Sequence, residues 1–295
     1  MISAAPGLHV VTYHYVRDMP RTRFPRIKGI LVDAFRRQVD WLAERYEMAT
    51  LESALAFVAG DYTPSRDLCL LTFDDGLKEH FVEVTPILAE RRIQGQFFLP
   101  TVCIEEHRVV LVHQNHFLMA ALGFDEYQTE FLQLLAELAP EVDCRVDAQL
   151  AQRTYRFDTP PVAEFKYLLN FCLSDDVRSA VLARLFEKHL QDESDFAKEL
   201  YVSWDEAREM QGAGMVLGGH SHRHKALGIM NDDDQRIIRP EDRVDEWIFG
   251  RDLAERRRSV RVERDIVLLV DLTPQELSHV SVEPEALLEA DDRQV

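Results

Sequence analysis

The sequence predicts an α/β fold in which a parallel sheet or (β/α) barrel carries a helical insertion. In the first third of the chain, short apolar runs alternate with segments whose apolar residues recur at helical spacing. Alternation of this kind favours parallel strands that are covered on both faces. Two of the apolar runs lead directly into acidic or histidine-rich sequence, and active sites of barrels form at the carboxyl ends of strands.

The N-terminal elements follow one another in a regular order. Residues 8–16 are β-branched and aromatic enough for a first strand, and a loop rich in Arg and Pro follows. A later apolar run is too brief for a helix and ends at Gly76, so it predicts a second strand. The other expected elements of this part are helices over 32–45, 51–58 and 82–92 and a strand over 95–99.

A helical insertion is expected over residues 101–200, because apolar residues three and four apart predict helices there. After the insertion, the alternation of helix and strand resumes. Ser203 is a good N-cap for a helix over 204–211, and a short strand at 214–217 leads into Gly-Gly-His-Ser-His-Arg-His. The helices expected within the insertion cover 126–138, 161–173 and 175–190.

Composition excludes several classes of function. The formal net charge of -18, with Lys and Arg scattered among 52 acidic residues, excludes a nucleic-acid-binding protein. No apolar stretch approaches the roughly 20 residues that span a bilayer. The first residues lack the basic start and apolar middle of an export signal, so we expect a cytoplasmic protein. Four widely spaced cysteines predict reduced, mostly buried thiols.

The strand at 67–73 ends in Asp74-Asp75-Gly76, and this ending needs an explanation. Asp-Gly after an apolar run is most often a hairpin turn. Here a helical segment follows, which favours a loop at the carboxyl end of a parallel strand. Two adjacent carboxylates repel each other unless a cation or a proton lies between them. We therefore expect a metal ion that one carboxylate binds, while the other accepts a proton.

Three histidines stand within five residues after the last predicted strand. His220 and His224 are four apart, so on a helical turn their imidazoles would point from one face and bind one ion. Three histidines on a surface loop can also be accidental. In the helical geometry His222 points elsewhere, so it is expected in solvent or in a supporting contact, and His220 with His222 is the less favoured ligand pair.

These two motifs, in this order, resemble the polysaccharide deacetylases, the NodB-type carbohydrate esterases. The resemblance rests on Thr72-Phe73-Asp74-Asp75-Gly76 and on His220-Ser221-x-x-His224, and it extends over roughly residues 10–235. It implies a deformed (β/α) barrel of the NodB type and a divalent metal, most often zinc. By position, the resemblance makes Asp75, His220 and His224 the metal ligands and Asp74 the general base. Weaker parts of the resemblance are residues 12–15, 97–100 and 203–204.

The resemblance implies hydrolysis of an N-acetyl group on an amino sugar within a polysaccharide, an oligosaccharide or a glycan precursor. The metal would activate water, and Asp74 would take its proton. Two alternatives stay open at this point. The same site would serve an amidohydrolase of small nitrogenous metabolites, and a catalytically impaired metal- or glycan-binding protein would keep the fold without the reaction.

The resemblance ends at about residue 235, where the composition also changes. Residues 236–295 contain 10 Arg and 15 acidic residues but no Lys, whereas all 6 lysines precede them. The family's C-terminal Arg, its Tyr-Pro-Tyr-Gly-like turn and its acid histidine are not recognisable, and His279 is the one later histidine. We predict a catalytic domain over 1–235 and hypothesise a replaced or out-of-frame C-terminus over 236–295, which would leave the barrel incomplete.

Polar residues elsewhere in the chain are further candidates for the site. The polar residues at 105–107 and 113–116 are expected to form a solvated loop rather than additional ligands. His14 follows the first strand, and it would either line the pocket or be a satisfied core histidine.

Overall fold

The computed structural model describes residues 6–224 and 280–281. The chain is a mixed α/β protein that divides into two compact units. Of the described residues, the first unit comprises 6–18, 29–105, 200–224 and 280–281, and the second comprises 19–28 and 106–199. The expected functional division at residue 235 lies outside the described residues and stays a prediction.

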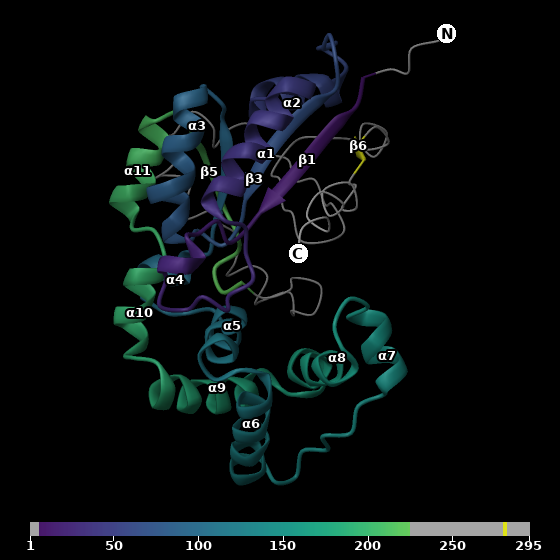
Figure 1. Cartoon of the computed structure of the whole chain (residues 1–295), viewed down its shortest axis with the longest axis vertical. Coiled ribbons are helices and arrows are strands. Elements are labelled where there is room, and N and C mark those ends of the chain that lie inside the picture. Colours follow the sequence, from purple (N-terminus) through teal and green to yellow (C-terminus); the bar gives the residue numbers. More distant parts are fainter. Residues whose placement is uncertain (1–5, 225–279, 282–295) are drawn as a thin grey trace. The chain divides into compact units, whose positions relative to one another are not determined.

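A parallel sheet forms the centre of the first unit (Figure 1). Its strand order is β5-β4-β3-β1-β6, every neighbouring pair is parallel, and β2 pairs with the start of β3. The parallel sheet is therefore confirmed. The described strands do not return to close on themselves, so the barrel stays a prediction. The strands are β1 Leu8–Tyr13, β2 Glu47–Met48, β3 Leu68–Phe73, β4 Gly95–Leu99, β5 Val216–Gly219 and β6 Val280–Ser281.

Two helices of the first unit begin where the sequence supplies a capping box. Thr50 and Ser53 form a capping box at the start of α2, and Ser203 and Glu206 form another at the start of α11. A left-handed glycine, Gly60, ends α2. The helices of this unit are α1 Val32–Arg45, α2 Leu51–Ala59, the π-helix η2 His80–Val84, α3 Thr85–Arg91, α4 Thr101–Glu105 and α11 Trp204–Gly212.

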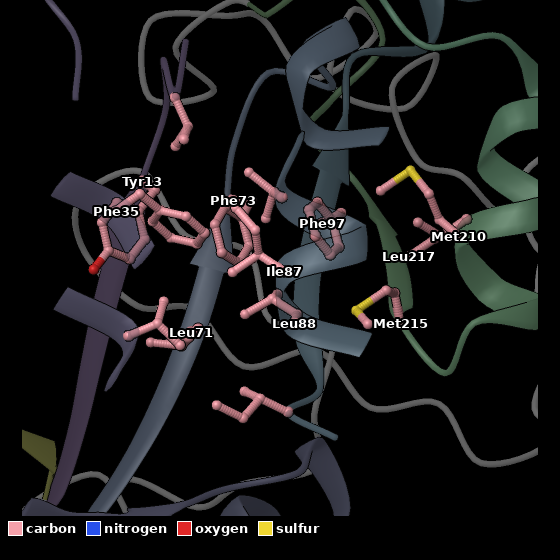
Figure 2. Packing of buried hydrophobic residues seen from close by; sticks show 14 of the residues in the cluster. Tyr13, Phe35, Leu71, Phe73, Ile87, Leu88, Phe97, Met210, Met215 and Leu217 are labelled. Atoms are coloured by element: carbon pink, nitrogen blue, oxygen red, sulfur yellow. The ribbon is translucent and has the colours of Figure 1, made fainter. Parts of the chain in front are cut away.

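Strand β3 is buried along its whole length, as a strand covered on both faces must be. Leu71 and Phe73 point into a cluster with residues of α1, α3 and α11, while Leu68 and Leu70 pack with residues of α2. The ring of Phe73 stacks on that of Phe97 at 4.6 Å and on that of Tyr13 at 5.4 Å (Figure 2). This row of rings fixes the end of β3 against its neighbouring strands.

The second unit is helical and has its own apolar core. The rings of Tyr127, Phe131 and Phe165 meet edge to face with centroids 5.3–6.0 Å apart. The segment 19–28 is joined to this unit because the Nε of Arg26 donates to the carbonyl oxygen of Ala120 at 2.7 Å. Its elements are η1 Met19–Arg21, α5 Leu111–Leu122, α6 Phe124–Leu138, α7 Ala148–Thr154, α8 Pro160–Tyr167, the π-helix η3 Leu168–Cys172, α9 Asp175–His189 and α10 Glu193–Leu200.

Some expectations from the sequence were wrong. The solvated loop expected at 113–116 is part of α5, and the side chains of His113 and Gln114 are buried. The thiols are free, but only Cys69 and Cys103 are buried, whereas Cys144 and Cys172 are exposed. The segment 236–279, which includes His279, lies outside the described residues. Among the residues that the structure describes, no helix is both long and apolar enough to cross a bilayer.

The stacked row of rings predicts a large loss of stability in Phe73→Ala. The truncation removes a fully buried side chain between two aromatic neighbours, so we expect the free energy of unfolding to fall by about 3–5 kcal/mol. Denaturant-induced unfolding measures this loss. Phe157→Ala is the control, because the side chain of Phe157 is 82% exposed and its removal should change stability by less than about 0.5 kcal/mol. Equal losses in the two variants would contradict the packing described.

Candidate metal centre

The loop after β3 presents two adjacent carboxylates at the carboxyl end of the sheet. The backbone N–H of Asp74 donates to the carbonyl oxygen of Tyr13 at 3.0 Å, which continues the pairing of β3 with β1. Asp75 has a φ of 78° and Gly76 a φ of 59°, so the chain turns through left-handed backbone directly below the carboxylates. The side chains of Asp74 and Asp75 are both buried.

The histidine loop is attached to the neighbouring strand. The N–H of His220 donates to the carbonyl oxygen of Leu99 at 2.9 Å, which extends the pairing of β5 with β4. The N–H of Val102 donates to the carbonyl oxygen of His222 at 3.0 Å, and the Nδ1 of His222 lies 2.8 Å from the Oγ1 of Thr101. The imidazole of His222 is thus engaged by Thr101 and is not a member of the cluster formed by its neighbours.

The helical turn expected at 220–224 was wrong. The segment is a loop, and Ser221 and His224 have φ values of 56° and 52°. Left-handed backbone is unfavourable for residues other than glycine, and it persists where the surrounding structure imposes it. The two imidazoles nevertheless meet, with ring centroids 4.7 Å apart.

Asp75, His220 and His224 converge on one point. The Oδ1 of Asp75 lies 3.1 Å from the Nε2 of His224 and 3.6 Å from the Nε2 of His220, and the three ligand atoms lie within 4.8 Å of one another. Two ligands at about 2.0–2.1 Å from one tetrahedral zinc ion would be about 3.4 Å apart. One carboxylate and two imidazoles are also a donor set that zinc accepts. These residues therefore fit a divalent ion.

Buried ionisable side chains surround the cluster of Asp75, His220 and His224. Among the described residues, Asp74, Asp75 and Glu79 place three carboxylates in buried or nearly buried positions, and the guanidinium of Arg17 is buried beside Glu79 and forms an ion pair with it. Burial raises the pKa of Glu79, and Arg17 opposes this rise. Glu79 thus has its own cationic partner in Arg17, whereas Asp74 and Asp75 face imidazoles.

A histidine outside the two motifs also reaches the site. The Nε2 of His14, directly after β1, lies 3.8 Å from the Oδ2 of Asp74, and the His14 side chain is 53% exposed. The in-register pairing of Tyr13 with Phe73 brings the residues that follow these strands to the same edge of the sheet. The interpretation of His14 as a core histidine is therefore wrong, because its side chain is half exposed, and its role in lining a pocket stays a prediction.

Contacts below the carboxylates hold the loop in place. The N–H of Val202 donates to the carbonyl oxygen of Gly76 at 2.9 Å, and the Nζ of Lys78 lies 2.5 Å from the Oε2 of Glu206. The same Glu206 oxygen accepts from the backbone N–H of Ser203 at 2.7 Å. The loop after β3 is therefore connected to the start of α11, whose capping box uses the same carboxylate.

Comparisons with known proteins complete the description. No protein-family model matches the chain, and no curated protein matches it. The chain is similar to the solved structure of the Streptococcus pyogenes deacetylase PplD in complex with acetate, with 12% identity, 83% of this chain and 69% of that chain covered and a TM-score of 0.43. It is also similar to IcaB from Ammonifex degensii (17% identity, 79% and 64% covered, TM-score 0.40). A third similar structure is a de-N-acetylase from Aggregatibacter actinomycetemcomitans (14% identity, 73% and 55% covered, TM-score 0.37).

In the last two comparisons the match spans less than two thirds of the solved chain. The chemistry that the site can perform follows from its own side chains.

The converging ligand atoms predict that the protein binds one divalent ion and that His220→Ala impairs this binding. Loss of a supporting contact typically lowers metal affinity by about 10- to 100-fold, and loss of a ligand should exceed that range. Titration of metal-free protein with Zn²⁺ by calorimetry measures the change. His222→Ala is the matched comparison in the same loop, and its loss of metal affinity should be smaller. Equal losses in His220→Ala and His222→Ala would contradict the assigned ligands.

Proposed function

We propose that the protein is a metal-dependent hydrolase that removes an N-acetyl group from an amino sugar. The observation that carries the proposal is the convergence of Asp75, His220 and His224 beside a second buried carboxylate, Asp74. The sugar part of the proposal rests on the resemblance of the two motifs to polysaccharide deacetylases. The reaction adds water to the acetyl carbonyl carbon and breaks the C–N bond, which gives acetate and a free amine.

The ligand residues have one task in this reaction. Asp75, His220 and His224 would hold the divalent ion, zinc as the first candidate, and three protein ligands are the number found in catalytic zinc sites. When bound, such an ion supplies Lewis-acid chemistry, which polarises a carbonyl group and makes water more acidic.

Asp74 and His14 divide the proton transfers. Asp74 is adjacent to the ligand Asp75 and buried, so its carboxylate is in place to accept the proton of the attacking water. His14 faces Asp74 from the strand β1 side and is half exposed, so it is in place to donate a proton to the departing nitrogen. The Nε2 of His14 and the Oδ2 of Asp74 are 3.8 Å apart, so the two side chains reach the same part of the site.

We also propose a cytoplasmic location. All four cysteines are free, and Cys144 and Cys172 are exposed. Free exposed thiols are usual where glutathione and thioredoxin keep them reduced, and they are rare in secreted proteins.

The assigned base predicts that Asp74→Asn releases acetate from N-acetylglucosamine oligomers about 10²- to 10⁴-fold more slowly while it keeps the metal. The amide cannot accept the proton, but the three ligands are unchanged. Acetate release and metal content of the same preparation provide the two measurements. Asp205→Asn, at a side chain that is 89% exposed, is the control and should match the wild type.

If the metal-loaded wild type releases no acetate, the alternative of a metal- or glycan-binding protein is favoured. If it is active, a chelator should abolish the release.

The assigned donor predicts that His14→Ala lowers kcat by about 10²- to 10⁴-fold, because protonation of the leaving nitrogen is lost. Added imidazole should restore part of this rate. His9→Ala is the matched control, since His9 lies on β1, the strand that precedes His14, but its Nε2 faces Asp67 at 3.1 Å. An unchanged kcat in His14→Ala would remove His14 from the mechanism and leave the metal ligands untouched.

A further inference from the structure

We propose that His80 is a positioning residue that holds His14 in place beside Asp74. The inference rests on the proposed function for its catalytic consequence, but the contact itself is independent of any reaction. The Nε2 of His80 lies 2.8 Å from the backbone carbonyl oxygen of His14. A carbonyl oxygen only accepts hydrogen bonds, so His80 must carry its proton on Nε2.

The surroundings of His80 make this bond a fixed one. The side chain is fully buried, and its ring lies against the rings of Phe73 and Phe97, with centroids 5.7 and 5.6 Å away. These two rings belong to the stacked row of the core. His80 therefore has little freedom to follow a shift of the carbonyl group of His14, and the position of the strand end is set by the core.

The backbone of His80 is held as well. His80 begins the π-helix η2, in which the N–H of Thr85 donates to the carbonyl oxygen of His80, five residues before it. The Oγ1 of Thr85 donates to the same oxygen at 2.8 Å. Single π-turns within helices occur frequently at functional sites. Here the wide turn follows the carboxylate loop directly, and its first residue reaches across to the segment after β1.

Neighbouring contacts show that the whole segment after β1 is held from the same side. The N–H of Asp74 donates to the carbonyl oxygen of Tyr13, His80 donates to that of His14, and Glu79 forms an ion pair with Arg17. Three successive anchors thus lie on residues 74–80 and hold residues 13–17. Of the three, only the bond from His80 acts on the residue whose imidazole faces Asp74. A misplacement of about 1 Å lowers catalysis by as much as 10²-fold.

The first test needs no catalysis. Long-range ¹H–¹⁵N correlation spectra of protein labelled with ¹⁵N-histidine report the tautomer of each neutral imidazole. We expect the Nε2–H tautomer for His80. The signals that are missing from the spectrum of His80→Gln are those of His80, which assigns them. His80→Leu should shift or broaden the signals of His14, whereas His80→Gln, whose amide nitrogen reaches the same carbonyl, should leave them close to those of the wild type. An Nδ1–H tautomer at His80, or unchanged His14 signals in His80→Leu, would overturn the inference.

The second test measures acetate release in a double-mutant cycle of His80→Leu and His14→Ala. If His80 acts through His14, His80→Leu lowers kcat by about 10- to 100-fold with little change in KM. It then adds less than about 2-fold to the loss already caused by His14→Ala, since residues that act as one unit are not additive. His80→Gln should recover most of the wild-type kcat. Multiplicative losses would mean that His80 acts independently of His14 and would overturn the inference.

Controls separate this inference from a loss of fold and from failure of the proposed function. Gln96→Met deletes another side-chain hydrogen bond, that from the buried Gln96 of β4 to Gln94, and should lower the thermal midpoint without lowering kcat. Zinc content should stay the same in every variant. Should the zinc-loaded wild type release no acetate, the proposed function fails, and the tautomer and the His14 signals alone decide on His80. Should the wild type be active and His80→Leu equally active, the inference fails and the proposed function stands.

Discussion

The burial of two adjacent carboxylates at the end of β3 is the constraint on which the rest of the site depends. Asp74 and Asp75 are buried, and they directly follow a strand that is itself buried along its length. Two like charges in such a place are unfavourable unless other groups compensate them. The structure provides two imidazoles at Asp75, a third imidazole at Asp74, and a separate guanidinium for the nearby Glu79. The imidazoles and the guanidinium are thus gathered around buried acids, and a divalent ion held by Asp75, His220 and His224, as proposed above, would compensate the carboxylates further.

Much of the framework could be predicted from the sequence because its signals are local. The helix over 32–45 and the strand over 95–99 have the predicted bounds, and Ser203 is the predicted N-cap. The apolar run at 67–73 is a buried parallel strand that ends one residue before Asp74. The convergence of Asp75 with His220 and His224 was expected from the resemblance of the two motifs, and it agrees with the position of β3 and β5, whose carboxyl ends lie on either side of β4 at one edge of the sheet.

The remainder depended on direction and register, which a local pattern does not contain. Spacing suggested that His220 and His224 meet on a helical turn, yet they meet through a loop with left-handed residues. His14 could be assigned to the site only through the pairing of Tyr13 with Phe73. His80 lies just before the helix expected over 82–92, and only the π-turn and the contact with the carbonyl group of His14 distinguish it. Distant pairings of this kind arise from tertiary packing.

The left-handed backbone at Asp75, Ser221 and His224 has a consequence for protein design. A designer who transplanted the same three ligand types onto two regular elements of a new scaffold would copy the chemistry but not the chain path that aims it. Gly76 would have to be copied as well, because a side chain there would come within 2.9 Å of Leu99. The transferable unit is therefore the pair of irregular loops together with the two strands that support them.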